Sequence, residues 1–430
     1  MDTFLSKRGA RSFEETTMNT SKLPLSDYRI LDLTMMTAGP VGTMMLGDIG
    51  ADVIKVEEIG AGELSRGIGA VFVEGESSIF LSQNRNKRSI RLDLKSVEGR
   101  DAFLRIAKSV DVITENFRPG TVDRLGIGYD AVRAINPSII YASVSAFGQT
   151  GPYAHLPAND PVIQALSGLM AMTGEPNGAP VRIGSPYPDF GAAALLAFAV
   201  SAALLHRERT GEGQKIELSL LAGAIFSAIP RDGETLRTGK APPRLGSAHP
   251  TFVPYRNYQG AEGSYFFLAC FTEKFWQSLC KALERPDLAS DERFATNVQR
   301  CANREALDRE LEGAFSTRPT TEWLEILGKF NVPAAPIQDL HDTLRNDPQV
   351  RHNNMLVEVE HPTAGTVEML ALPIDFRGTP AEYRRAAPRL GANTEEILVE
   401  FGFEPAEIDH MMEAGTIAGV KDLRKAEDAK

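Results

Sequence analysis

Cysteine is scarce in this chain, and so is histidine in any ligand-like spacing. Cys270, Cys280 and Cys301 are the three cysteines, and no two of them form a CxxC pair. An odd number without that spacing predicts neither a disulfide framework nor a thiolate metal site, and it is typical of a reduced, cytoplasmic protein. The seven histidines are scattered along the chain. We therefore expect no bound metal.

Long hydrophobic runs and excess positive charge are also lacking. The longest apolar run, residues 190–205, is shorter than the roughly 20 residues that a helix needs to span a bilayer, and its alanine content favours a core helix. A net charge of −11 argues against nucleic acid or an anionic membrane as the main partner. Residues 1–22 have no secretory apolar core, so we expect a flexible tail there.

The length of 430 residues predicts more than one lobe, because a single core rarely grows beyond about 300 residues. With 43% hydrophobic and 24% charged residues, the composition is that of a folded globular protein. Composition shifts divide the chain into a large domain at 23–228, a polar Gly/Pro-rich linker at 229–250, a smaller α/β domain at 251–340, and a second linker with a returning C-terminal part at 341–430.

Apolar segments of strand length alternate with amphipathic segments of helix length. This alternation predicts an α/β fold around a parallel sheet. The predicted strands are 28–34, 52–58, 89–94, 110–115, 139–145, 214–221, 263–270, 356–359 and 366–370. The predicted helices are 41–46 (its start), 98–109, 190–205, 273–282, 304–314, 320–328 and 394–401.

The turn after the first predicted strand resembles a dinucleotide loop only in part. It contains GxxG at Gly39 to Gly42 instead of GxGxxG. Glu57 and Glu58 end the second predicted strand, where the ribose-binding acid of a nicotinamide enzyme would lie. An NAD-dependent oxidoreductase is therefore one alternative.

Basic residues gather in the segment NRNKRSIRLDLK. Arg85, Lys87, Arg88, Arg91 and Lys95 are either a solvated strand edge or a phosphate-binding site.

A second polar segment, ENFRPG, follows the predicted strand at 110–115, and ligands bind at such strand ends in open α/β sheets. Phe117 could stack on a base or pack on a pantetheine chain, and Arg118 and Arg124 could pair with phosphate. The alternative is an ordinary turn eased by Gly120.

Asp189 stands directly before the alanine-rich run in SPYPDFGAAALL. Aspartate is a favoured helix N-cap and gains from the helix dipole, which together contribute about 1 kcal/mol. A carboxylate held at a buried helix start is also oriented for chemistry. Both a capping and a catalytic role are open on the residues alone.

Several motifs occur together in a fixed order, and with them the chain resembles the class III CoA-transferase family over residues 23–404. The motifs are AGP at 38–40, GADVIKVE at 50–57, NRNKRS at 84–89, ENFRPG at 115–120, GQTGPY at 148–153, PDFG at 188–191, RTGEGQ at 209–214 and LGANTEEIL at 390–398.

The resemblance implies an enzyme that moves CoA from an acyl-CoA to a free carboxylic acid, with Asp189 as the nucleophile. It implies a Rossmann-like parallel-sheet large domain, a smaller α/β domain and an interlocked homodimer. CoA and acyl-CoA would be substrates, without a permanently bound cofactor. The CoA contacts implied are Thr37, Ala38, Leu92, Lys95, Asn116, Phe117, Arg118, Arg124, Ala158 and Asn159.

Two positions depart from patterns within the family. Glu58 stands where some members carry a phosphate-binding arginine. Lys87, Arg88 or Arg66 would have to take over the role of that arginine. The family also includes alpha-methylacyl-CoA racemases, which pair a histidine with the aspartate. Asn159 and Asp160 occupy the matching positions here, and an amide cannot exchange the proton as imidazole does. The racemase is therefore the weaker alternative, and a non-catalytic CoA-binding protein is a third.

Three segments most resemble the branch that uses succinyl-CoA and dicarboxylic acids: 247–256, 332–340 and 359–367. A second carboxylate on the acceptor acid would need a cation. Arg182, Arg244 and Arg256 are the candidates for it.

Overall fold

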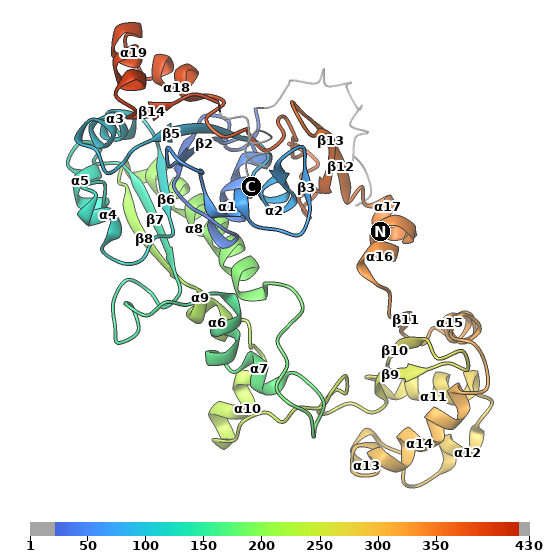
Figure 1. The fold of residues 1–430 in the computed structure, drawn as a ribbon. Coiled ribbons are helices and arrows are strands. Elements are labelled where there is room, and N and C mark those ends of the chain that lie inside the picture. The colour runs from blue at the N-terminus through green and yellow to red at the C-terminus, as the bar shows by residue number, and fades with distance from the viewer. Residues whose placement is uncertain (1–21, 421–430) are drawn as a thin grey trace, which may run out of the picture.

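The computed structural model describes residues 22–420, so residues 1–21 of the expected tail lie outside the described part of the chain (Figure 1). The strands are β1 (Arg29–Asp32), β2 (Asp52–Glu57), β3 (Phe72–Val73), β4 (Glu76–Ser77), β5 (Lys87–Leu92), β6 (Val112–Glu115), β7 (Ile140–Ser145), β8 (Gln214–Ser219), β9 (Tyr255–Gln259), β10 (Tyr265–Ala269), β11 (Ala334–Pro336), β12 (Leu356–His361), β13 (Gly365–Leu370) and β14 (Ile417–Ala418).

The helices alternate with these strands through most of the described chain. They are α1 (Ala38–Asp48), the 3₁₀ turn η1 (Leu64–Gly67), α2 (Ser78–Gln83), α3 (Val97–Ala107), α4 (Thr121–Arg124), α5 (Tyr129–Arg133), α6 (Asp160–Leu166), α7 (Leu169–Met172), α8 (Tyr187–Thr210), α9 (Leu220–Phe226), α10 (Arg231–Thr238), α11 (Glu273–Ala282), α12 (Pro286–Ser290), α13 (Asn297–Ala302), α14 (Arg304–Phe315), α15 (Thr320–Lys329), α16 (Leu340–Asn346), α17 (Pro348–His352), α18 (Thr394–Glu400) and α19 (Pro405–Glu413).

The large sheet confirms the predicted parallel α/β architecture. Its order is β14-β5-β2-β1-β6-β7-β8. All neighbouring pairs from β5 to β8 are parallel, and β14 adds an antiparallel edge. The six parallel strands thus follow the order 3-2-1-4-5-6 of doubly wound nucleotide-binding sheets, with a switch point between β1 and β6.

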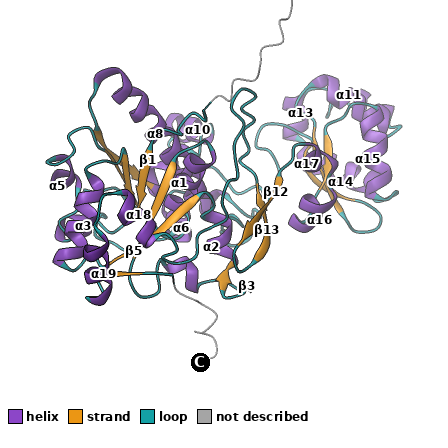
Figure 2. Cartoon of the chain, turned by 90° about the horizontal axis from the view of Figure 1, so that it is seen from above, coloured by secondary structure: helices purple, strands orange, loops and turns teal. Residues whose placement is uncertain are grey.

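Successive residues on each strand point to opposite faces and enter two separate cores. Leu31, Ile54 and Ile113 pack with α3, α5, α18 and α19 on one face. Ile30 and Val53 pack with α1, α6, α8 and α9 on the other. Figure 2 shows the sheet between these two helical layers. Both faces are covered, which explains why the strands read as continuous apolar runs.

Helix α8 covers the second face and is the described helix long and apolar enough, by length and composition, to cross a membrane. Ala192, Leu196 and Val200 are buried in the core with α1 and the sheet. Its remaining face is exposed and carries Phe198 and Leu205. The predicted core helix therefore packs on one side only.

The residues from β9 to β11 form a smaller lobe, in which β11-β10-β9 make an antiparallel sheet. This lobe has its own core, centred on Trp276, Phe266 and Phe315. Figures 1 and 2 show it set apart from the large sheet. The chain reaches it through a segment that contains α10, where the sequence predicted an irregular linker, and leaves it through α16 and α17.

Candidate functional site

At the switch point of the sheet, one side chain connects the ends of β1 and β6. Asn116, directly after β6, accepts a hydrogen bond from the Met35 N–H (2.9 Å) and donates one to the Met35 carbonyl (2.8 Å). Met36, the next residue, has a φ of +69°, a left-handed conformation that non-glycine residues rarely adopt. Asn116 therefore fixes the turn that leads from β1 into α1, because its amide pairs with that turn's backbone.

A cavity of about 570 Å³ lies at the carboxyl ends of the strands, on the face that carries α3. Its walls come from the ends of β1, β2, β5 and β6, so it lies where open α/β sheets bind ligands. Of the predicted CoA contacts, Leu92, Lys95 and Phe117 line it. Sequence reasoning missed Met35, Ile59 and Leu64, because a cavity wall depends on which strand ends the fold brings together.

The other predicted CoA contacts surround the same edge of the sheet. Thr37 is the N-cap residue of α1 and Ala38 is its first residue. Arg118 and Arg124 are exposed beside α4. Asn159 is the N-cap residue of α6, with Ala158 before it. All of them follow the carboxyl ends of parallel strands, so the fold brings them to one side of the molecule.

Asp189 lies at this edge, on the face of the sheet opposite the cavity. It is the third residue of α8, whose N-cap is Pro186, and no side chain of its own caps the helix. Of the two roles that the sequence left open for Asp189, the role of N-cap is therefore wrong. Its carboxylate has no hydrogen-bond or ion-pair partner among residues 22–420, although the residue is half-buried. Burial and then the charge of Asp160 raise its pKa from 3.8 to about 6.

Helices α1 and α8 bring the turn after β1 next to Asp189. Both helices run back from the carboxyl edge of parallel strands, so they run in the same direction. They pack so closely that a Cβ at Gly42 would lie 2.9 Å from the Ala193 carbonyl oxygen. Since Thr37 and Asp189 lie about equally far before this crossing, the two helix starts are neighbours.

The four residues of the basic cluster between positions 85 and 91 form neither a solvated surface nor a phosphate site. Arg85, Lys87, Arg88 and Arg91 are all buried. Lys87 is held by Asp32 (2.8 Å) and by the Asn84 side chain (2.8 Å), and burial lowers its pKa to about 8. Of this cluster, only Lys95 is exposed beside the cavity. For these four residues, both a solvated strand edge and a phosphate-binding site were wrong predictions, because their acidic partners come from segments far away in the sequence.

None of the three residues suggested as substitutes for an arginine at position 58 is free to bind phosphate. Arg66 forms two hydrogen bonds of 2.7 Å to Glu57. Arg88 binds Asp52 and Glu400 near the opposite ends of the strands, and Lys87 is committed to Asp32. Because Glu57 is occupied by Arg66, it is also not available as the ribose-binding acid of a nicotinamide enzyme.

The three arginines proposed to bind a second carboxylate on the acceptor differ in whether they already have a partner. Arg256 pairs with Asp308 (3.1 Å) and Glu312 (3.3 Å) in the smaller lobe. Arg244 donates to the carbonyls of residues 171, 175 and 178. Arg182 is exposed, belongs to the loop that leads into α8, and has no charged or hydrogen-bonding partner among residues 22–420. Of the three, Arg182 is free to meet an anion.

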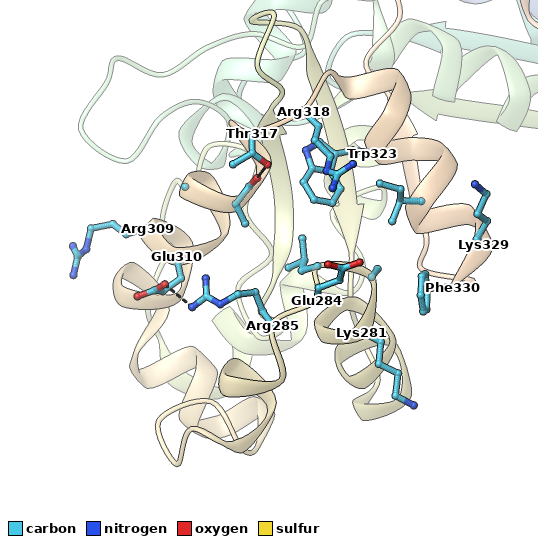
Figure 3. A pocket seen from close by; sticks show the side chains of 15 residues that line it. Lys281, Glu284, Arg285, Arg309, Glu310, Thr317, Arg318, Trp323, Lys329 and Phe330 are labelled. Atoms are coloured by element: carbon cyan, nitrogen blue, oxygen red, sulfur yellow. Dashed lines mark hydrogen bonds and ion pairs between the residues drawn. The ribbon is translucent and has the colours of Figure 1, made fainter.

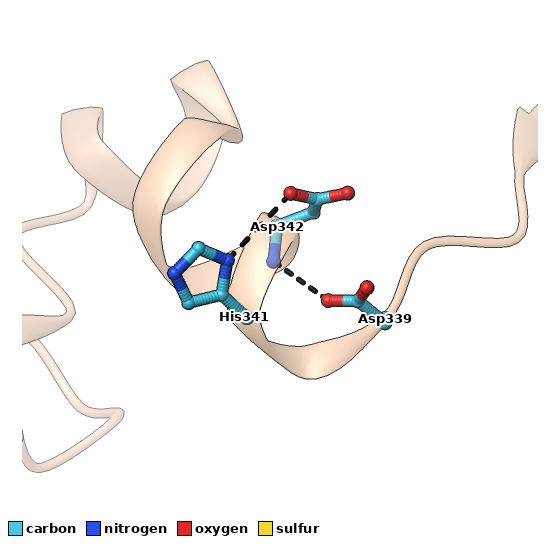
Figure 4. Close-up of side chains that lie close together, drawn as sticks. All are labelled: Asp339, His341 and Asp342. Carbon is cyan, nitrogen blue, oxygen red and sulfur yellow. Dashed lines mark hydrogen bonds and ion pairs between the residues drawn. The ribbon is translucent and has the colours of Figure 1, made fainter.

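Two other features lie outside this edge. A cavity of about 670 Å³ in the smaller lobe is lined by several basic residues, but Lys281, Arg309 and Lys329 point outward from it (Figure 3). Asp339, His341 and Asp342 lie close together and are all exposed (Figure 4). There the Asp339 carboxylate caps α16 by accepting the Asp342 N–H at 2.9 Å, which accounts for the cluster.

Comparison with known proteins gives one consistent family. Residues 25–394 match the profile of CoA-transferase family III. The chain is 38% identical to an acetyl-CoA:oxalate CoA-transferase of Acetobacter aceti over 91% of this chain and 100% of that protein. It is 36% identical to a succinyl-CoA:glutarate CoA-transferase of Mus musculus over 92% and 91%. The crystal structure of a CAIB/BAIF family protein from Brucella suis superposes with a TM-score of 0.81 at 36% identity, covering 89% of this chain and all of that one.

Proposed function

This chain belongs to CoA-transferase family III and is an enzyme that transfers CoA, and from that premise we propose that it moves CoA from succinyl-CoA or a similar acyl-CoA to a dicarboxylic acid, with Asp189 as the nucleophile. The observation that carries the proposal is the free carboxylate of Asp189 at the edge of the sheet. Among residues 22–420, no side chain or backbone group donates a hydrogen bond to this carboxylate, so its oxygens are available to attack. Oxalate and glutarate, named for two relatives, are both dicarboxylic acids.

The proposed path of CoA follows the geometry of this edge. The nucleotide end would occupy the cavity beside Lys95 and Phe117. The pantetheine arm would cross the turn at Met35 to Ala38, which separates the cavity from the start of α8. The thioester would then meet Asp189. Holding the two reactants in this way can supply about 7–11 kcal/mol of the barrier reduction.

The chemistry proceeds in balanced exchanges at one carboxylate. Asp189 attacks the thioester carbon and the C–S bond breaks. CoA leaves as a thiolate, and the donor acyl group stays on Asp189 as a mixed anhydride. The thiolate attacks the Asp189 carbonyl, which releases the donor acid and leaves an aspartyl-CoA thioester. The acceptor carboxylate then attacks the aspartyl thioester, which releases the CoA thiolate and forms a second mixed anhydride. The thiolate attacks the acceptor carbonyl of that anhydride, so a new acyl-CoA leaves and Asp189 is regenerated.

The racemase alternative is less consistent with the structure. A racemase needs a second group that exchanges a proton with the substrate α-carbon. Asn159 cannot titrate, and the Asp160 carboxylate already accepts hydrogen bonds from the Gln164 side chain and the Asp189 N–H. Asp160 therefore holds the backbone of Asp189, and Asn159 cannot act as a second acid or base.

A homodimer is part of the proposal. Apolar side chains are exposed on α8, α9 and α10, among them Phe198, Phe226 and Leu236. Large apolar side chains that gather on the outside of a soluble protein are typical of an interface. We propose that a second copy of this chain covers these helices.

The first experiment is a trapping assay with succinyl-CoA and hydroxylamine. In the wild type, we expect intact mass and peptide mapping to show a hydroxamate at residue 189, and Asp189→Ala should show none and should lose transfer activity by more than about 10³-fold. A wild type that forms no adduct with any acyl-CoA of a panel would contradict the mechanism.

A second arm tests the acceptor class. Arg182→Met should lower kcat/KM for glutarate or oxalate by about 10-fold or more, because the remote carboxylate loses its charged partner. It should leave the rate with a monocarboxylic acid such as butanoate nearly unchanged. An equal loss for both acids would remove Arg182 from recognition of the second carboxylate.

A further inference from the structure

The start of α8 is capped by a side chain from another helix. Tyr187 donates its N–H to the Ser185 carbonyl (2.8 Å), Pro188 has no N–H, and Phe190 donates to the Pro186 carbonyl (3.0 Å). The Asp189 N–H remains, and it donates to Oδ2 of Asp160 at 3.1 Å. Asp160 thus does for α8 what an N-cap side chain usually does within one helix.

Asp160 is itself held by a fixed partner. Its Oδ1 accepts a hydrogen bond of 2.6 Å from Nε2 of Gln164, one turn further along α6. Oε1 of Gln164 accepts the Ile183 N–H at 2.8 Å. Gln164 is fully buried, and Asp160 is only 5% exposed. The loop between Ile183 and Asp189 is therefore tied at both ends to a single pair of side chains on α6.

We infer that Asp160 and Gln164 form a positioning relay that fixes the Asp189 carboxylate and its neighbouring loop for nucleophilic attack. The inference rests on the proposed function and goes beyond it, since it concerns residues that do not contact the reacting atoms. The relay acts on the backbone of Asp189, so it leaves the carboxylate itself without a donor. That arrangement suits a nucleophile, because a hydrogen bond to the attacking oxygens would have to be broken first.

The charge of Asp160 gives the relay a second effect. A like charge next to a half-buried carboxylate disfavours ionisation of that carboxylate, which is the second cause of the raised pKa of Asp189 after burial.

The elements packed around α8 offer little other charge. Helix α9 and strand β7 contain no charged residue, and α6 contains Asp160 alone. On α1, Asp48 lies at the far end and pairs with Arg85 (2.6 Å). On β8, Lys215 pairs with Glu217 (2.7 Å). The exposed Arg182 belongs to the tied loop itself. Asp160 is thus the charge that dominates at Asp189.

The test separates charge from position with two variants. Asp160→Asn removes the charge and one acceptor. We expect kcat to fall by about 10-fold or more, because a small misplacement of a reacting group is costly, and the acid limb of the kcat–pH profile to move to lower pH. Gln164→Leu keeps the charge but breaks the tie, so kcat should fall without a shift of the acid limb.

Asp111→Asn is the matched control. Asp111 likewise accepts a backbone N–H, from Arg29 (2.7 Å), and a side-chain N–H, from Arg207 (2.7 Å), but it lies at the opposite edge of the sheet. We expect Asp111→Asn to lower the melting temperature and to leave the acid limb in place.

Failure of the inference is distinguishable from failure of the proposed function. If wild type and Asp160→Asn form the Asp189 hydroxamate at equal rates and share one acid limb, the relay is overturned while the nucleophile stands. If Asp160→Asn does not fold, as judged by circular dichroism, a Gln164→Leu variant with wild-type kcat overturns the relay. If the wild type forms no hydroxamate at all, it is the proposed function that fails.

Discussion

Asp189 lies in the first turn of α8, where its backbone N–H donates a hydrogen bond to Asp160. Sequence statistics favour aspartate as an N-cap, and SPYPDFG offers a helix start directly after it. The helix instead begins three residues earlier, at Tyr187, so Asp189 falls in the first turn and its carboxylate has no partner among residues 22–420. A local pattern indicated that a helix starts here, but the exact first residue depends on Pro186, Pro188 and the contact with Asp160.

The raised pKa of Asp189 predicts a cost in stability. Below pH 3.8 the carboxyl group is protonated in both folded and unfolded chains, and between pH 3.8 and about 6 the folded chain binds more protons. Stability therefore falls as pH rises through this window, and above it the folded state bears a penalty of up to about 3 kcal/mol. Asp189→Asn should remove the penalty, so its free energy of unfolding should exceed that of the wild type at pH 8 and by less at pH 5.

Urea denaturation at the two pH values measures this difference, with Asp189→Glu as the control that keeps a carboxyl group in place. A gain for Asp189→Asn that is the same at pH 5 and pH 8 would show that packing, and not ionisation, is responsible. The prediction links function to instability, since the same environment that leaves the nucleophile unpaired also penalises its charge.

At the scale of elements, the parallel strands were predictable and their charged neighbours were not. Apolar runs such as DVIKVEE and IIYASVS fall on β2 and β7 because both faces of this sheet are covered. The cluster from Arg85 to Arg91 reads as polar surface, yet it is buried because Asp48, Asp52 and Glu400 meet it from distant segments. Strand β14, of two residues, has no periodicity from which its pairing with β5 could be inferred.

The crossing of α1 and α8 makes a prediction at the same scale. A Cβ on Gly42 would lie 2.9 Å from both the Ala193 carbonyl oxygen and Leu196 Cδ2, and backbone cannot yield as a flexible side chain can. Gly42→Ala should therefore destabilise the protein by about 1–3 kcal/mol and lower kcat, because it spreads the two helix starts. Gly313→Ala on α14, where a Cβ meets nothing within 4 Å, should be neutral or stabilising.

Thermal unfolding and steady-state kinetics on the same preparations test this pair of variants. A Gly42→Ala protein with wild-type melting temperature would mean that α8 shifts freely, and the site would then not depend on this crossing.

At the scale of the whole molecule, the prediction concerns the apolar side of α8. The helix is buried on one side only, and the Phe198 side chain is 72% exposed in a single chain. Leaving several large apolar groups in water is costly, at about 25 cal/mol for each Å² that could be buried, so a second copy that covers them gains free energy. The two chain segments that join the lobes also leave the smaller lobe free to contact a partner, as Figure 1 shows it apart from the large sheet.

Phe198→Glu should therefore dissociate the proposed homodimer, because the new carboxylate would lose its hydration in a closed interface. Light scattering after size exclusion at micromolar concentration should give twice the mass of the 46.8 kDa chain for the wild type and the mass of one chain for the variant. Val298→Glu, at a similarly exposed position on α13 of the smaller lobe, is the matched control and should keep the wild-type mass. A wild type that is monomeric at this concentration would contradict the argument, since the apolar side of α8 would then be stable in water without a partner.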